Sequence, residues 1–190
     1  MPNNGVDIIV VDDNVVLLAT LSEILKACGY SVRTASDGIC ALAEIRYHAP
    51  DVLLCDLNMP GISGFELLSI VRRCYPRINV VAMSGSYSGR AVPAGVAADA
   101  FYGKGTTSVA DLLQMVSSMK DQSEVSLLRA ATPIWISSAL VDPTGGRSAL
   151  VACPECLKVY PHSVTDAEYS QDTKCPHCSY LVQLAIVPTT

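Results

Sequence analysis

Short apolar runs alternate with stretches of helical periodicity over the first two-thirds of the chain. The runs Ile8–Val11 and Val52–Cys55 are apolar at every position, which is typical of strands buried on both faces of a parallel sheet. The intervening stretches carry apolar residues every three or four positions, as helices do. This pattern predicts strands over Asp7–Val11, Ser31–Ala35, Asp51–Asp56, Ile78–Met83 and Ala98–Tyr102. It predicts helices over Asn14–Cys28, Asp37–His48, Ser63–Cys74 and Thr106–Met119.

Five successive strand–helix units define the expected fold class. Because crossovers between parallel strands are right-handed, such units build an α/β sheet with helices on both faces. We therefore predict a flavodoxin-like (βα)5 doubly wound sheet with strand order 2-1-3-4-5. The helical signal is weakest in the segment 85–95, where three glycines and Pro93 lower helix propensity. Any helix in this segment should be short or mobile.

The pattern changes after residue 120. Residues 121–131 read as a linker or as an extension of the last helix, and residues 132–190 as a small β-rich domain. Strands are predicted over Pro133–Val141 and Arg147–Ala152, on either side of the turn signal Asp-Pro-Thr-Gly-Gly at 142–146. Further strands are expected over Leu157–Tyr160 and Tyr180–Val187.

Composition narrows the class of protein. Half of the 190 residues are hydrophobic, which allows a substantial core and excludes global disorder. No apolar run reaches the roughly 18 uncharged residues of a membrane span, and the N-terminus lacks the features of a signal peptide. We therefore expect a cytoplasmic protein without a membrane partner.

Three carboxylates follow two of the predicted strands. Asp12 and Asp13 come directly after the first strand and Asp56 ends the third, so the strand order brings them to one edge of the sheet. Carboxylates that close need a counter-charge, and either Mg²⁺ or Lys104 can supply it. Ser84 adds a hydroxyl at the same edge. A strand-end acid alone can simply cap a helix, but this whole set is what a phosphoryl-binding site needs.

These residues carry a family resemblance. Asp12-Asp13, the segment Asp56–Gly64, Ser84 and Lys104 stand in the order and approximate spacing found in the receiver domains of two-component response regulators. The chain resembles that family over its predicted first domain, residues 5–120.

The resemblance implies a role for each matching residue. Asp56 would accept a phosphoryl group from a sensor histidine kinase or a phosphotransfer protein. The remaining roles implied are Mg²⁺ binding by Asp13, Asp56 and the backbone carbonyl of Asn58, with Asp12 acting through water; phosphoryl contacts by Ser84 and Lys104; and a switch aromatic at Phe101, with Tyr102 as the alternative. Catalysis would be limited to the protein's own phosphorylation and dephosphorylation.

Two features depart from the family. Gly105 follows Lys104 where the family usually has proline, so the lysine has a less rigid neighbour. The segment 85–95, rich in glycine and proline, replaces the family's fourth helix, which is part of the usual output face. These departures bear on how the signal leaves the domain.

Two Cys-x-x-Cys pairs lie near the C-terminus, separated by eighteen residues. Cys153-Pro-Glu-Cys156 and Cys175-Pro-His-Cys178 have the spacing of a tetrahedral zinc site and resemble a zinc ribbon. A thioredoxin-type redox pair is disfavoured because there are two pairs and no surrounding βαβ unit, whereas iron stays open as the metal. His162 and His177 are not expected as ligands, because four sulfurs complete the site.

The charge of the chain indicates whether its partner is a nucleic acid or a protein. The net charge is −5, and residues 150–190 offer two lysines, Lys158 and Lys174, against the acids Glu155, Asp166, Glu168 and Asp172. Contacts to nucleic-acid phosphates need clustered basic residues, so a downstream protein target is expected instead. A transcription regulator whose ribbon contacts DNA and a small-molecule phosphoaspartyl phosphotransferase are the alternatives, although the latter lacks a visible substrate cap. A homodimer is left open.

Overall fold

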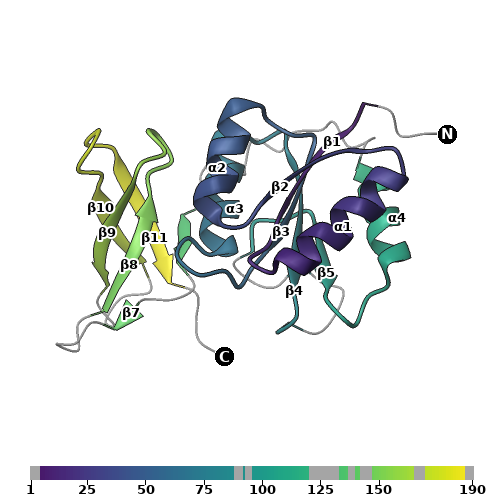
Figure 1. Cartoon of the computed structure of the whole chain (residues 1–190). Coiled ribbons are helices and arrows are strands. Elements are labelled where there is room, and N and C mark those ends of the chain that lie inside the picture. Colours follow the sequence, from purple (N-terminus) through teal and green to yellow (C-terminus); the bar gives the residue numbers. More distant parts are fainter. Residues whose placement is uncertain are drawn as a thin grey trace.

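The computed structural model describes residues 5–87, 92, 96–119, 133–136, 140–141, 147–164 and 170–186. Figure 1 shows a twisted central sheet with helices on both sides and a smaller group of C-terminal strands beside α2 and α3. The predicted linker 121–131 and most of the segment 85–95 lie outside the described residues.

The central sheet has five parallel strands in the order β2-β1-β3-β4-β5. Its strands are β1 (Asp7–Val11), β2 (Ser31–Ala35), β3 (Val52–Asp56), β4 (Asn79–Ser84) and β5 (Ala100–Gly103). Its helices are α1 (Val15–Ala27), α2 (Gly38–Tyr47), α3 (Gly64–Cys74) and α4 (Val109–Met119). The predicted fold class and strand order are therefore confirmed.

Polar side chains set where three of the helices begin. The Asn14 side chain accepts hydrogen bonds from two backbone N–H groups in the first turn of α1. Asp37 does the same for Cys40 in α2, and Ser63 for Glu66 in α3. These caps satisfy N–H groups that have no partner within the helix, which explains why each helix starts at the boundary visible in the sequence.

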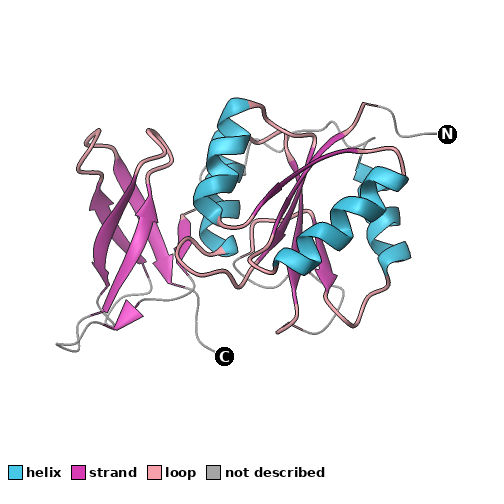
Figure 2. Ribbon diagram, viewed as in Figure 1, coloured by secondary structure: helices cyan, strands magenta, loops and turns pink. Residues whose placement is uncertain are grey.

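Each face of the sheet buries its own core. Successive side chains of a strand point to opposite faces, so Ile9 and Leu53 join the core beneath α2 and α3 while Val10 and Leu54 join the core beneath α1 and α4. Figure 2 shows the two helical layers on either side of the strands.

Helix α3 is buried on every side. All nine residues from Gly64 to Arg72 are buried, whereas a surface helix normally leaves one face in solvent. The reason is a second layer: strands β6 and β8 of the C-terminal strands pack on the outer side of α3. The apolar residues of these strands are therefore part of the same core as the inner side of α3.

The C-terminal β region, residues 133–186, consists of two three-stranded sheets. One has the order β10-β11-β6 and the other β7-β8-β9. Its strands are β6 (Ile134–Ile136), β7 (Leu140–Val141), β8 (Arg147–Ala152), β9 (Val159–Val164), β10 (Ser170–Lys174) and β11 (Leu181–Ile186).

Strands β8 and β11 follow the prediction closely, whereas β9 begins at Val159 rather than at Leu157, which lies in the cysteine loop, and continues to Val164. The single strand expected over Pro133–Val141 appears as β6 and β7, and residues 137–139 between them lie outside the described residues. Strand β10 was missed, because Ser-Gln-Asp-Thr-Lys has no alternation of apolar and polar residues. It forms because its backbone pairs with β11 from Ser170 opposite Ala185 to Lys174 opposite Leu181.

Candidate functional site

The three predicted carboxylates converge at one edge of the central sheet. Asp12 follows β1 and Asp56 ends β3, and these two strands are neighbours in the sheet. One carboxylate oxygen from each of Asp12, Asp13 and Asp56 lies within 4.8 Å of the others. Asp12 and Asp56 are buried, whereas Asp13 is exposed. The pocket is therefore open to solvent on the side of Asp13.

Lys104 supplies the counter-charge. Its Nζ lies 2.6 Å from Oδ2 of Asp12 and 2.8 Å from Oδ1 of Asp56. Burial alone lowers the pKa of Lys104, but the hydrogen bonds to the two carboxylates outweigh it and raise the pKa above its usual value. Burial raises the pKa of Asp56, and Lys104 opposes that rise. The lysine thus stabilises the ionised form of Asp56, which is the nucleophilic form.

Two hydroxyl groups lie at the same edge of the sheet as the carboxylates. Ser84 ends β4, adjacent to β3, and is fully buried. Asn58 Nδ2 donates to Ser84 Oγ at 3.2 Å and to Ser86 Oγ at 3.1 Å, and the Ser86 amide donates to Ser84 Oγ. Ser86 is an addition to the residues expected from the sequence. The Mg²⁺ role of the Asn58 carbonyl stays a prediction.

The two aromatic residues before Lys104 point to opposite faces of the sheet. Phe101 is buried in the core on the α2 and α3 side, and Tyr102 in the core on the α1 and α4 side. The role of Phe101 as a switch stays a prediction. Gly105 has φ +80°, a left-handed conformation that glycine adopts without steric cost, and this explains why glycine follows Lys104 here.

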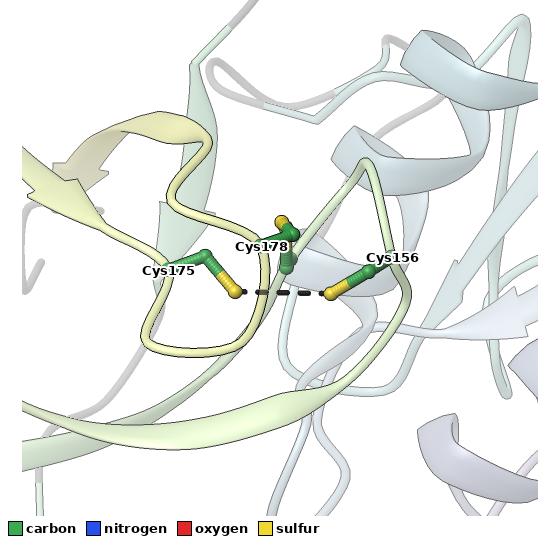
Figure 3. A group of neighbouring side chains, drawn as sticks. Cys156, Cys175 and Cys178 are labelled. Carbon is green, nitrogen blue, oxygen red and sulfur yellow. Dashed lines mark hydrogen bonds between the residues drawn. The ribbon is translucent and has the colours of Figure 1, made fainter.

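The four C-terminal cysteines come together from two similar loops. Sγ of Cys153 lies 3.6 Å from Sγ of Cys178, and Sγ of Cys156 lies 3.7 Å from Sγ of Cys175. Figure 3 shows Cys156 and Cys175 extending from separate loops toward each other, with Cys178 beside them. A disulfide has an S–S distance of about 2 Å, so this spacing is not that of two disulfides.

The sulfur positions fit a tetrahedral metal. Zn–S bonds of about 2.3 Å at tetrahedral angles place neighbouring sulfurs about 3.8 Å apart. The observed distances are 3.6 and 3.7 Å, and all four sulfurs lie within 4.8 Å of one another. Burial opposes ionisation of Cys175, but the backbone N–H groups of His177 and Cys178 and the neighbouring thiols lower its pKa to about 7. A thiol of that pKa readily becomes a metal ligand at neutral pH.

Both cysteine loops turn through a left-handed residue. Leu157 follows Cys156 with φ 57°, and Ser179 follows Cys178 with φ 62°. In each loop the amide of this residue donates to the carbonyl of the first cysteine of the pair, at 2.8 and 2.9 Å. The two loops therefore share one backbone shape. They differ in burial, because Pro154 in the first loop is buried and Pro176 in the second is exposed.

Four residues on α3 contact the C-terminal β region, and the sequence did not single them out. Glu66 Oε1 accepts from the Ala152 amide at 2.7 Å, and Ser69 Oγ accepts from the Trp135 amide at 3.2 Å. The other two contacts are from Arg73 to the Tyr180 hydroxyl and ring, and from the Cys74 thiol to the Pro154 carbonyl. The apolar residues around Glu66 predict burial of α3, but nothing local shows what covers its outer face.

The Glu66 carboxyl is an unusual group to bury. Burial raises its pKa to about 8, and the hydrogen bond from Ala152 opposes this only in part. At neutral pH the carboxyl is therefore mostly protonated. Ala152 directly precedes Cys153, so this contact joins α3 to the strand that leads into the cysteine cluster.

The comparisons with known proteins agree with this geometry. The sequence matches the response regulator receiver domain over residues 8–102, half of the chain. It is 41% identical over 81 residues to the nitrogen assimilation regulatory protein NtrX of Azorhizobium caulinodans, a match covering 42% of this chain and 18% of NtrX. It is 36% identical over 84 residues to the transcriptional regulatory protein ZraR of Klebsiella oxytoca, a match covering 44% of this chain and 19% of ZraR.

Solved structures share the fold of the first part of the chain. The response regulator TrrA of Thermotoga maritima, solved in complex with Mg²⁺ and BeF, superposes with a TM-score of 0.55 at 29% identity. That match covers 60% of this chain and 98% of TrrA. The chain belongs to the response regulator receiver domain family and carries a two-component receiver domain. The predicted resemblance is thereby confirmed.

The curated relatives are much longer than the matching segment. The chain spans less than a fifth of the length of NtrX and ZraR. Within the part of the chain that the structure describes, no helix is both long and apolar enough to cross a membrane.

Proposed function

We propose that this protein is a response regulator in which phosphorylation of Asp56 controls a zinc-holding C-terminal β region that binds a protein target. The observation that carries the proposal is the cluster of Asp12, Asp13 and Asp56 at the carboxyl edge of the sheet, with the Lys104 ammonium paired to Asp12 and Asp56. The phosphoryl donor would be a phosphohistidine on a sensor kinase or a phosphotransfer protein. The similarity to the sensor histidine kinase RcsC of Salmonella typhimurium, 33% identical over 84 residues, supports this class of donor.

The pocket supplies what transfer to a carboxylate needs. An oxygen of Asp56 attacks phosphorus, an O–P bond forms, the N–P bond of the phosphohistidine breaks, and the imidazole leaves and takes up a proton. Lys104 and the Ser84 hydroxyl are placed to contact the oxygens of the transferred group. Asp13 and Asp56 would hold Mg²⁺ together with the backbone carbonyl of Asn58, and Asp12 would act through water. When bound, the ion neutralises charge on the phosphoryl oxygens.

Helix α3 gives a direct physical route between the two sites. Gly64, its first residue, lies so close to the phosphoacceptor that a Cβ there would be 2.0 Å from the Asp56 carbonyl oxygen. Less than one turn later, Glu66 accepts the hydrogen bond from Ala152. A shift of α3 on phosphorylation would therefore move the contacts of the C-terminal β region. This route supplements the linker 121–131, which the sequence suggests as the connection.

Phosphorylation is tested by labelling. With Mg²⁺ and acetyl phosphate or a phosphohistidine donor, the wild-type chain should gain one labile phosphoryl group and Asp56→Asn should gain none. Intact-protein mass spectrometry at neutral pH measures the added mass. Equal labelling of the two proteins would refute the assignment of Asp56.

Two further variants separate metal binding from phosphoryl contact. Asp13→Ala should lose Mg²⁺ affinity and phosphorylation together, because it removes an oxygen ligand on the exposed side of the pocket. Lys104→Ala should retain most Mg²⁺ binding but respond weakly to phosphorylation. Titration with Mg²⁺ followed by hydrogen exchange of residues 121–186 measures both effects. Identical exchange with and without the phosphoryl group would argue against coupling.

The partner class is tested by nucleic-acid binding. The net acidic balance of residues 150–190 opposes contacts to phosphates, and four thiolates around Zn²⁺ add further negative charge. Anisotropy titrations with labelled duplex DNA and single-stranded RNA at roughly physiological salt should show no submicromolar binding. Tight binding that weakens steeply with salt would favour a transcription regulator instead.

A further inference from the structure

A groove lies between α2 and the first cysteine loop. Its walls are formed by five residues of α2 and two residues of the C-terminal β region, and its volume is about 450 Å³. The lining residues are Ile39, Leu42, Ala43, Arg46 and Tyr47 on one side and Leu157 and Val159 on the other. Because each wall comes from a different part of the chain, the groove exists only while the C-terminal β region is docked on the receiver domain.

The α2 wall exposes large apolar side chains. Ile39 is 53% exposed and Tyr47 is 88% exposed, although both are large hydrophobic residues. Leu157 and Val159, on the opposite wall, are half-buried. Exposed apolar residues that gather around a hollow are typical of a binding surface, and tyrosine is enriched at the residues that dominate binding energy.

Leu157 is an unexpected residue for its backbone position. Its φ of 57° is left-handed, where a β-carbon is unfavourable and glycine would fit without cost. The equivalent residue in the second loop, Ser179, has the same conformation but does not line the groove. Backbone strain of this kind persists where the side chain serves a purpose. The Leu157 side chain forms part of the groove wall, and that is the purpose the structure offers.

The charge at the groove defines the complementary partner. Arg46 is the charged residue among those that line it. Its side chain is exposed, and within the described residues it forms no ion pair. An apolar groove with an exposed, unpaired arginine in its wall favours a ligand that combines bulky apolar side chains with carboxylates.

We propose that this groove binds a short segment of the partner protein, with bulky apolar residues flanked by aspartate or glutamate. The inference rests on the proposed function, because it specifies the surface through which the protein target is bound. It also explains how phosphorylation could control binding, since any movement of the C-terminal β region relative to α2 changes the width of the groove.

The groove is tested with selected peptides on the intact protein. Random twelve-residue peptides are displayed and selected against the full-length, zinc-loaded, unphosphorylated chain. The enriched sequences are then synthesised with a fluorophore, and their affinities are measured by anisotropy. The enriched peptides should combine leucine, phenylalanine or tryptophan with acidic residues, and they should bind less tightly as salt is raised.

Matched variants locate the binding site. Leu157→Gly removes a groove side chain while relieving the left-handed backbone, and the zinc content of the variant reports whether the loop still folds. Ser179→Gly makes the same backbone change in the other loop, away from the groove. Leu157→Gly, Tyr47→Ala and Arg46→Glu should each weaken binding about tenfold or more. Ser179→Gly, and Val16→Ala on the exposed start of α1, should change it less than about twofold.

Several results would overturn the proposal. They are the absence of any enriched peptide, enrichment of basic peptides, or equal losses in Leu157→Gly and Ser179→Gly. Sedimentation equilibrium showing a dimer that Tyr47→Ala abolishes would show that a second copy covers the groove instead. Asp56 labelling and zinc content are measured on the same variants and should match wild type. A wild-type protein that neither labels at Asp56 nor contains zinc would refute the proposed function. A wild-type protein that does both but binds no selected peptide would refute the groove alone.

Discussion

Removal of the metal proposed for the four-cysteine cluster should unfold the C-terminal β region. Cys175→Ser, or treatment of the wild-type chain with a strong chelator, should abolish the cooperative unfolding transition of residues 133–186. The expected effect is large because structural zinc supplies about 10–16 kcal/mol in small zinc peptides, comparable to the whole stability of a domain. Cys175 is buried, and its sulfur lies 3.7 Å from that of Cys156 across the cluster.

Trp135 reports directly on this transition. It is the only tryptophan in the chain, and its amide donates to Ser69 on α3. Urea unfolding followed by its fluorescence, together with metal analysis, gives the measurement. Cys40→Ser is the matched control, because Cys40 is exposed on α2 and lies outside the cysteine cluster. Protein purified anaerobically without chelator and found to contain no metal would contradict the prediction, as would equal stability of Cys175→Ser and Cys40→Ser.

The free energy of unfolding should fall as pH rises from about 4.5 to about 8, and Glu66 should be responsible. The folded chain keeps this carboxyl protonated up to its pKa of about 8, whereas the unfolded chain releases the proton near the ordinary value of 4.5. Between these two values the unfolded state binds fewer protons, so increasing pH favours unfolding. Each pKa unit corresponds to about 1.4 kcal/mol, so the full shift sets an upper bound of about 5 kcal/mol.

Glu66→Gln should remove this part of the pH dependence. The amide keeps the shape and the acceptor oxygen for Ala152 but carries no ionisable group. Urea unfolding of the variant at several pH values should therefore show a flatter profile than wild type, with greater stability at pH 8. Glu23→Gln, on the exposed side of α1, serves as the control and should follow the wild-type curve. Parallel profiles for wild type and Glu66→Gln would show that the buried carboxyl is not the cause.

The central sheet could be predicted because its signals are local. Fully apolar runs mark the strands, and the capping residues Asn14, Asp37 and Ser63 mark the starts of three helices. Once the strand order is known, the sequence positions of Asp12, Asp56 and Lys104 place them at one edge. The distances of 2.6 and 2.8 Å in the structure agree with that placement.

The parts that could not be predicted depend on contacts between distant segments. Strand β10 has a polar sequence and forms because β11 offers its backbone as a partner. Glu66 is an ionisable residue with apolar neighbours in α3, and no local pattern distinguishes a solvated glutamate from one buried against Ala152. The left-handed conformation of Leu157 follows from the shape of the cysteine loop, and its groove appears only when α2 is in place.

Because α3 is buried on both sides, the receiver domain cannot simply be separated from the C-terminal β region and fused to another domain. A cut at the end of α4 would separate the receiver domain from the C-terminal β region. Here such a cut would expose Ile70, which is fully buried, together with the Glu66 and Ser69 groups that now face β8 and β6. A chimera made from residues 5–119 should therefore be poorly soluble unless the outer face of α3 is redesigned. We therefore expect the receiver domain and the C-terminal β region to be inherited and exchanged as a unit.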